Sequence, residues 1–560
     1  MAKKPNIAAK APRPKTLVIP DKYAPILGTV LLAGLLFLFF LLRLHYKDMS
    51  YERDEGTYAY MGKLLLEGKK PYTYFYEMKP PGLFYMYAFM ISIFGSSVTG
   101  LHIGFFIINI LTSLAMFGWI RRMLNPTAGV LAAVAYSIIS TSPHASGLTI
   151  QAEHLLCLFL LGGLWMLWEA FHANKSWMWI LAGVLMSWSF LIKQNGAFFI
   201  LFALVAIFLD HFMSGEKRKN SELVKSVSLF GIGGIIPVAL MVGILAAQGS
   251  LKEFWFFIYE FPKQQYLTSI EFSRGMGYFQ DRLGLIKSGY EWVWYTAGLG
   301  LILSWIFDSS LKRKILTTLL LILSVLSIAP GLRFYGHYWI HFLPAIAVLF
   351  AVAVNLATEW MASNKWINHP KTISLIVLFL VSILTINANK LYFFSADPEK
   401  VVRMVYGSNP FPESRKVGDF LNTVMKPDEK LMVLGSEPQI YMYTDKFCAS
   451  RHFYCGNLVQ KPEIVKTWAK EFKNDFTKNP PDYVVWVNHP FSWSIPQGGD
   501  TKFIDWAYKQ IMISYHPIGW AEYISPNESK YTFDVKNAMN YKPSAKEYMI
   551  VLQKNSNVGL

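Results

Sequence analysis

The stretch GLFYMYAFMISIFG (82–95) decides how the chain is folded across a membrane. It is apolar throughout, but a membrane-spanning helix needs roughly 20 apolar residues and this stretch is shorter. Its length predicts an interfacial or re-entrant helix. Because one extra span would move every later loop to the other side, this stretch fixes the topology of the whole chain.

Longer apolar runs lie on both sides of it. The chain is 53% hydrophobic and only 16% charged, whereas soluble domains are roughly 25% charged. Eleven runs are predicted to span, with boundaries open by a few residues: 24–42, 98–120, 127–142, 154–171, 177–192, 195–212, 227–247, 291–307, 315–330, 338–357 and 372–388. We therefore expect an α-helical, polytopic membrane protein.

The basic residues give the expected orientation. Lys and Arg are enriched in cytoplasmic loops. With segment 1–23 inside and 82–95 not spanning, the inner connections hold Arg121, Arg122, Lys175, 216–219, Lys225, Lys312, Arg313, Lys314, Lys365 and Lys371. The first external loop is then 44–97, and the C-terminus is external. This distribution accounts for the net charge of +16 and argues against nucleic-acid binding.

From about residue 392 onward, the pattern of apolar and polar residues changes. We divide the chain into a basic N-terminus (1–23), a transmembrane domain (24–391) and a small extracytoplasmic α/β domain (392–560). In the last, 414–425 is predicted to be an amphipathic helix, and 431–435, 483–487 and 548–553 are predicted to be buried strands. Cys448 and Cys455 could form a disulfide, but the sequence does not decide this.

Five polar clusters share the predicted outer face. They are 52–72 with EMKPPG (77–82), SPHASGLTIQAEH (142–154), Lys193–Gln194, the aromatic stretch 252–266, and RFYGHYWIHFLP (333–344). Two of them have an ordinary structural explanation: Asp54–Glu55 could be only a charged helix start, and Lys193 could be only a snorkelling side chain. Stretch 252–266 is predicted to be an interfacial helix.

Together these clusters indicate a reaction site. Carboxylates and cations that are far apart in sequence meet at one membrane face: Asp54, Glu55, Glu153, Lys79, Lys193 and Arg333. A carboxylate can deprotonate a hydroxyl group, and fixed cations can stabilise a departing phosphate. This combination suits an anionic substrate that is held near the lipid surface.

The motifs DEGTYAYMGKLLLEGKKPY (54–72) and EMKPPG (77–82) resemble those of the GT-C membrane glycosyltransferases. The most similar branch contains the bacterial protein O-mannosyltransferases and the lipid A aminoarabinose transferases. The Lys193–Gln194 pair, the 333–338 segment and an extracytoplasmic C-terminal domain also fit this resemblance, which therefore covers nearly the whole chain. The motifs do not specify the sugar.

The resemblance implies transfer of a sugar, with inversion, from a polyprenyl-phosphate donor to an outer-face acceptor: a protein, lipid A or another surface glycan. Asp54 would be the general base, Glu55 would support it or tune the loop, and Glu153 would take the place of a second acidic residue, often Asp in relatives. Lys79 and Lys193 would bind the donor phosphate, with Arg333 and His337 as weaker candidates. Stretch 252–266 would line the lipid-facing entrance.

Several points stay open at this stage. The sequence does not decide whether a cofactor is used: Asp54 and Glu153 could hold the divalent cation that some GT-C members use. The implied location is the bacterial inner membrane. A transporter or flippase of lipid-linked sugars is the main alternative, because charges inside a membrane also mark transport paths; such proteins usually have internal repeats, and we find none. A scaffold would leave the clustered charges unexplained.

Overall fold

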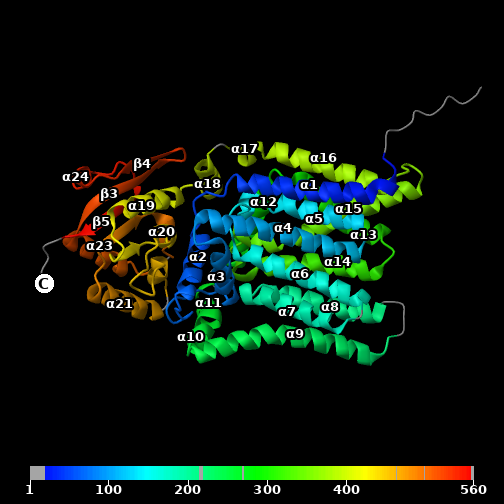
Figure 1. Ribbon diagram of the computed structural model, residues 1–560, viewed down its shortest axis with the longest axis horizontal. Coiled ribbons are helices and arrows are strands. Elements are labelled where there is room, and N and C mark those ends of the chain that lie inside the picture. The colour runs from blue at the N-terminus through cyan, green and yellow to red at the C-terminus, as the bar shows by residue number, and fades with distance from the viewer. Residues whose placement is uncertain are drawn as a thin grey trace, which may run out of the picture.

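The computed structural model describes residues 19–173, 175–213, 218–267, 270–395, 397–461, 463–496 and 499–555. Residues 1–18 of the predicted N-terminal segment and residues 216–217 of a predicted inner connection lie outside this part. Figure 1 shows a long bundle of helices on one side and a small domain containing a sheet on the other. The described strands all belong to this second part, between residues 431 and 554.

Helices of the bundle coincide with all eleven predicted spans. They are α1 (Ala24–Leu44), α4 (Val98–Met123), α5 (Pro126–Ile139), α6 (Ala152–Ala173), α7 (Ser176–Ile192), α8 (Gly196–Met213), α9 (Asn220–Ala247), α13 (Glu291–Phe307), α14 (Leu311–Ile328), α15 (Leu343–Ser363) and α16 (Pro370–Ala388). Among the described residues, seven helices are long and apolar enough to cross a membrane: α1, α4, α6, α8, α9, α15 and α16. The chain is a multi-pass membrane protein, as predicted.

One boundary differs from the prediction in an informative way. The run predicted to span from residue 338 begins with a 3₁₀ segment, η5 (Gly336–His341), and the α-helix α15 starts only at Leu343. Pro344 is the cause, because proline lacks an N–H donor and is tolerated in the first turn of a helix but not in its interior. The residues before Pro344 are therefore free to form an irregular segment at the end of the bundle.

Two helices of the first long loop lie across the bundle end that faces the small domain. They are α2 (Arg53–Leu66) and α3 (Gly82–Phe94), and Figure 1 shows both running across the direction of the bundle helices. The short helix predicted for 82–95 is thus confirmed. Gly62 allows the two helices to pack closely, since a Cβ atom there would lie only 2.8 Å from Cβ of Tyr87.

The predicted interfacial helix at 252–266 is also helical, in three consecutive pieces. These are α10 (Leu251–Trp255), the π-helical η3 (Phe256–Glu260) and α11 (Phe261–Gln265). The helix that follows, α12 (Phe272–Lys287), was not predicted. Its sequence contains three glycines, which are poor helix formers. The shorter elements of the bundle are η1 (Asp21–Tyr23), η2 (Pro143–Ala145), η4 (Pro330–Leu332) and α17 (Lys390–Phe393).

The small domain contains a five-stranded sheet in the order β1-β2-β5-β3-β4. The strands are β1 (Leu431–Leu434), β2 (Tyr483–Asn488), β3 (Tyr515–Ser525), β4 (Glu528–Thr532) and β5 (Glu547–Lys554). The β1–β2 pair is parallel and the other pairs are antiparallel. The predicted strands are β1, β2 and β5. Strand β3 was missed because Pro517 and Gly519 flank a register shift, and such residues weaken a strand pattern.

Helices surround this sheet. They are α18 (Pro398–Tyr406), α19 (Phe411–Val424), α20 (Gln439–Thr444), η6 (Cys455–Val459), α21 (Glu463–Lys478), α22 (Pro490–Trp493), α23 (Lys502–Ser514) and α24 (Val535–Ala538). The amphipathic helix predicted at 414–425 is α19. Cys448 and Cys455 are both buried with free thiols, so the possible disulfide is not present in this structure.

Candidate active site

Asp54 is held at the start of α2 by a reciprocal hydrogen-bond pattern. Glu52 caps the helix: its Oε2 accepts from the backbone N–H of Asp54 at 2.8 Å and of Glu55 at 3.2 Å. Glu55 in turn accepts from the backbone N–H of Glu52 at 3.3 Å. This capping box satisfies N–H groups that would otherwise lack partners. It confirms the helix start that the acidic pair predicted and fixes the backbone beneath the Asp54 side chain.

The Asp54 carboxylate remains accessible, with 31% of its side chain exposed. The hydroxyl group of Tyr58, one turn further along α2, donates to Asp54 Oδ2 at 3.3 Å. Nε2 of His337, from η5, lies 4.0 Å from the same oxygen. Burial lowers the pKa of His337, which favours the neutral imidazole. The structure therefore brings Asp54 and His337 together although they are far apart in sequence.

Lys79 lies close to the same group. Its ammonium lies 3.3 Å from Oε1 of Glu77 and 5.0 Å from the ring centre of Tyr58. Burial opposes its charge, but the neighbouring carboxylates Glu77, Asp54 and Glu153 raise the pKa of Lys79 above its ordinary value. The ammonium is therefore charged at neutral pH and is held at this position by both charge and an aromatic face.

Lys193 is buried between α7 and α8 and forms an ion pair with Glu153 at the start of α6. Its ammonium also lies 4.0 Å from the ring centre of Tyr338. The side chain thus points into the protein, and the snorkelling alternative does not describe it. A buried charge pair of this kind is stable only when both partners are present.

Lys79 and Lys193 line one cavity of about 250 Å³. Its other walls are mainly apolar and come from the 77–82 loop, the α7–α8 connection, α8, η3, α11 and the residues just after it, η4 and η5. The remaining lining residues are Met78, Gln194, Asn195, Phe198, Ile258, Pro262, Tyr266, Leu267, Pro330 and Tyr338. The predicted interfacial helix therefore contributes to the wall of the cavity.

Arg333 lies beside this cavity rather than in its lining. Its guanidinium carbon is 4.9 Å from the ring centre of Tyr266, and Nη1 donates to the hydroxyl group of Tyr335 at 3.2 Å. Because Tyr266 lines the cavity, Arg333 contributes positive charge behind an aromatic wall. Its predicted contact with a donor phosphate has less geometric support than that of the two lysines.

Glu55 is placed differently from Asp54, although the two are adjacent in sequence. Its side chain is fully buried: Oε1 accepts from the backbone N–H of Ile150 at 3.0 Å and lies 2.9 Å from Nε2 of His102. It therefore joins α2 to α4 and to the 142–154 segment.

The small domain holds the other side of α2. Nε of Arg53 donates to the carbonyl oxygen of Ser436 at 2.8 Å, and Nη2 donates to Oε1 of Glu437 at 3.0 Å. The fully buried Glu437 also accepts from the Ser492 hydroxyl group at 2.6 Å. Gly56 packs directly on Gln439, where an added Cβ would be 2.6 Å from the Gln439 Cβ.

Several of these residues were not singled out from the sequence. Glu52 could have been found from the Glu-x-x-Glu spacing of a capping box, and Tyr58 from its position one turn after Asp54. Glu77 is next but one to Lys79 in the EMKPPG motif. Glu437 had no such signal, because only the folding of the small domain brings it to Arg53.

The side chains near Asp54 and Glu153 give little support to a metal site. Among the described residues, no group of three or more His, Cys, Asp or Glu side chains is arranged to hold a metal ion. Glu153 is paired with Lys193, so a cation at Glu153 would have to replace this ammonium. The residues present do not fit a bound cation in this arrangement, and we assign no step to one.

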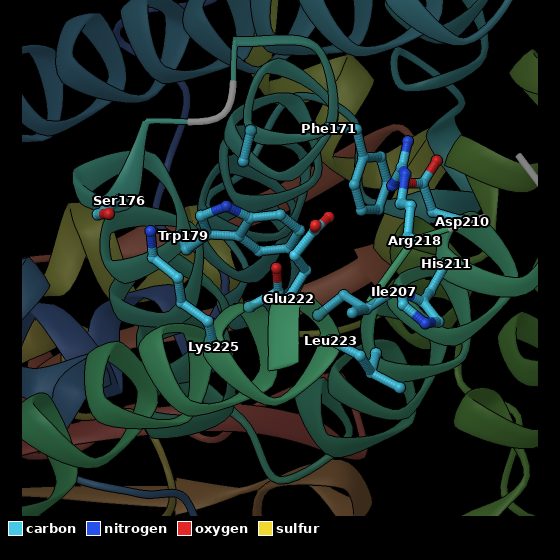
Figure 2. Close-up of a pocket in the computed structure, with 12 residues that line it drawn as sticks. Phe171, Ser176, Trp179, Ile207, Asp210, His211, Arg218, Glu222, Leu223 and Lys225 are labelled. Atoms are coloured by element: carbon cyan, nitrogen blue, oxygen red, sulfur yellow. The ribbon is translucent and has the colours of Figure 1, made fainter. Parts of the chain in front are cut away.

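A larger cavity, of about 440 Å³, lies at the other end of the bundle, between the ends of α6 and α8 and the starts of α7 and α9. In Figure 2, Asp210 and Arg218 lie together at its edge, and their side chains form an ion pair at 2.6 Å. Lys312 forms a second ion pair with Asp210. None of the predicted site residues lines this cavity, so the candidate site stays at the end next to the small domain.

Comparison with known proteins supports the same reading of the fold. Residues 78–241 match the family model described as dolichyl-phosphate-mannose-protein mannosyltransferase. No curated protein sequence matches the chain. The segment 78–241 that matches the family model includes Lys79, Glu153 and Lys193.

Two solved structures have a similar fold. ArnT from Cupriavidus metallidurans, bound to undecaprenyl phosphate, is 12% identical with a TM-score of 0.57, over 94% of this chain and 98% of that one. The oligosaccharyltransferase of Archaeoglobus fulgidus, tethered to an acceptor peptide, is 12% identical with a TM-score of 0.53, over 90% and 74%.

The fold and the family match confirm the resemblance to the GT-C superfamily that the motifs predicted. The matched mannosyltransferase model supports the predicted glycosyltransferase activity, and the solved structures show the same fold. The enzyme prediction is thus confirmed in preference to the transporter and the scaffold.

Proposed function

We propose that the chain transfers a sugar, with inversion, from a polyprenyl-phosphate donor to an acceptor on the membrane face that carries the small domain. The observation that carries this proposal is the mainly apolar cavity whose charged groups are Lys79 and Lys193. Such a cavity suits a ligand with a phosphate group and an apolar chain. ArnT, which has a similar fold, binds undecaprenyl phosphate.

The proposed reaction uses the side chains as follows. Asp54 takes the proton from an acceptor hydroxyl group, and the oxygen attacks the anomeric carbon from the face opposite the phosphate. The bond between this carbon and the phosphate oxygen breaks, and the polyprenyl phosphate leaves with the electron pair. Lys79 and Lys193 stabilise its charge, and the proton remains on Asp54. Attack from the opposite face inverts the anomeric centre.

The other predicted residues have supporting roles in this proposal. Glu153 orients Lys193 through their ion pair, and Glu55 holds the start of α2 against α4 and the 142–154 segment. His337 adjoins Asp54 and in this proposal contacts the sugar or the phosphate, and Arg333 adds positive charge behind Tyr266.

We place the enzyme in a bacterial inner membrane, with segment 1–23 cytoplasmic, segment 24–391 in the membrane and segment 392–560 outside. The ends of the bundle support this orientation. In Figure 1, the C-terminal end of α8 and the start of α9 lie away from the small domain, and basic residues such as Arg218 and Lys312 lie at that end. Excess Lys and Arg on one side favours a cytoplasmic location for it.

The test is a transfer assay with purified protein in lipid, radiolabelled undecaprenyl-phosphate sugars and an envelope fraction as acceptor. Asp54→Asn keeps the size of the side chain but removes the base, and we expect a loss of about 10²–10⁴-fold in rate. Asp428→Asn, an exposed position in the small domain, is the matched control and should keep full activity. Normal turnover of a folded Asp54→Asn protein would remove Asp54 from this role.

A further inference from the structure

A groove on the small domain contains an unusual number of lysines. It is a cavity of about 290 Å³ between α21, the segment before it and the start of α23. Five lysines and one carboxylate are its charged lining residues: Lys461, Lys466, Lys470, Lys473, Lys502 and Asp500. The groove is separate from the candidate active site and has no part in the reaction proposed above.

The lysines form a stripe because of the helical period of α21. Lys466, Lys470 and Lys473 are spaced by four and three residues, which places them on one face. The opposite face is buried through Trp468, Phe472 and Phe476. Like charges at these spacings destabilise a helix, so this stripe gains from an anionic partner.

Few carboxylates neutralise these charges. Lys466 pairs with Glu463 at 2.8 Å, but both side chains are largely exposed, and such surface pairs contribute little. Lys473 lies 5.2 Å from the ring centre of Trp506. In the part of the chain that the structure describes, no ion pair is formed by Lys461, Lys470 or Lys502. The positive charge of the groove is therefore only partly balanced by Asp500.

The shape of the groove distinguishes it from an ordinary solvated helix face. Its floor is apolar, formed by Leu458, Val465, Ala469 and Phe503. A ligand can therefore contact carbon atoms at the bottom and ammonium groups at the rim. Sugar rings that carry acidic substituents present both kinds of surface.

The direction of α21 argues against the membrane surface as the partner. Figure 1 shows α21 within the small domain, running in the direction of the bundle helices and outward from their ends. A stripe along this helix points away from the bilayer rather than lying on it. Trp468 of α21 packs on Phe257 of η3, with ring centres 5.7 Å apart, so the stripe begins next to the interfacial helix and leads outward.

We propose that this lysine groove binds an anionic glycan chain, with several acidic groups contacting several lysines at once. The interaction depends on charge and on the sugar backbone together. The proposed binding does not depend on the sugar-transfer reaction, because it involves no chemical step. An enzyme that acts at a membrane surface would use such a groove to hold a polymer near its outer face.

The test measures binding of fluorescently labelled polygalacturonate to the full-length protein in neutral detergent. The probe control is the fully methyl-esterified polymer of the same length, which keeps the sugar backbone without its charges. The groove variant is Lys466→Gln/Lys470→Gln/Lys502→Gln. The matched protein control is Lys509→Gln/Lys536→Gln/Lys542→Gln, which removes the same charge from exposed positions elsewhere in the domain.

We expect the groove variant to bind the acidic polymer at least about tenfold more weakly and the control variant to change by less than about twofold. The salt dependence of binding should also become less steep in the groove variant, by about one for each lost contact. Both variants are at the surface, where substitutions rarely affect folding. Thermal unfolding of each variant verifies this.

Three results would overturn the proposal. Equal losses in the two variants would indicate diffuse attraction to a basic protein. Equal binding of the esterified polymer would show that charge is not recognised. If phosphatidylglycerol vesicles compete as well as free polygalacturonate at the same charge concentration, and only through the groove lysines, then the partner is a lipid surface.

Discussion

Arg53 donates two hydrogen bonds to the small domain, to the carbonyl oxygen of Ser436 and, at 3.0 Å, to the buried carboxylate of Glu437. Since Arg53 immediately precedes Asp54, the candidate base is fixed both to the helical bundle and to the small domain. The small domain is therefore part of the structure that positions the site, whatever acceptor it contacts.

This relationship predicts the effect of Glu437→Gln. The amide keeps the size of the side chain but removes the charge opposite Arg53, and an unpaired buried charge is costly. We expect the maximal transfer rate per folded enzyme to fall about tenfold, equivalent to about 1.4 kcal/mol in the barrier, with the apparent donor affinity unchanged. Steady-state kinetics with the donor varied will separate the two.

Two comparisons show whether Glu437 acts through Asp54. Asp445→Asn breaks the ion pair with Lys63, which joins the other end of α2 to the same domain at 2.5 Å, and should leave the rate nearly unchanged. In the Asp54→Asn background, Glu437→Gln should cause little further loss. Additive losses in this cycle would mean that Glu437 affects something other than the base.

Lys193→Ala should weaken donor use more than acceptor use. The substitution removes a cation from the cavity and leaves Glu153 buried without its partner, so the donor phosphate would meet an uncompensated carboxylate. We expect the apparent KM for the donor to rise at least about tenfold, because a charged hydrogen bond to phosphate is strong. Lys193→Arg should recover part of this.

The control for this prediction is Lys371→Ala, an exposed position at the start of α16 that does not line the cavity. It should bind the donor normally. An unchanged donor KM in Lys193→Ala would mean that this lysine serves only the stability of α6 and α7.

Gly56→Ala should disturb the contact between α2 and α20. The new methyl group would lie 2.6 Å from Cβ and 3.0 Å from Cα of Gln439, closer than atoms can pack without movement. We expect a loss of about 1–3 kcal/mol in stability, typical of overpacked sites, together with reduced transfer. Gly34→Ala in α1, where nothing lies within 4 Å, should be neutral, and melting temperatures of both variants will show the difference.

Stability should fall in mild acid through His452. This buried imidazole lies 2.7 Å from the Tyr76 hydroxyl group and 2.9 Å from Oε2 of Glu471, and burial lowers its pKa below the ordinary value of 6.5. The unfolded chain therefore binds a proton more readily than the folded one at pH values below about 6.5. The stability that this group contributes is present above that pH and is lost as the pH falls through the folded pKa.

The measurement is the melting temperature of the protein in detergent between pH 7 and pH 5. His452→Gln should show a smaller decrease over this range than the unmodified chain. His516→Gln, a position in β3 with a partly accessible ring, should behave like the unmodified chain. If His452→Gln and the unmodified chain lose stability in parallel, other groups carry the acid sensitivity.

The pattern of the sequence predicted the larger features correctly. Apolar length identified the eleven bundle helices and set apart the short helix α3, because helix length is tied directly to the thickness of a bilayer. Alternation and apolar runs located β1, β2 and β5. Strands β3 and β4 were missed, since Pro517 interrupts the first and the second is a polar edge strand whose pairing comes only from its neighbour.

By itself the sequence determined that this is a membrane protein with carboxylates and lysines gathered in loops at one end, since these follow from composition, length and motif order. Only the tertiary structure decided how those groups are paired. It gave Asp54 an accessible position and Glu55 a buried one, although they are neighbours, because successive helical residues face different directions. It also joined Lys193 to Glu153 and Arg53 to Glu437, contacts that depend on packing between distant segments and leave no local trace in the sequence.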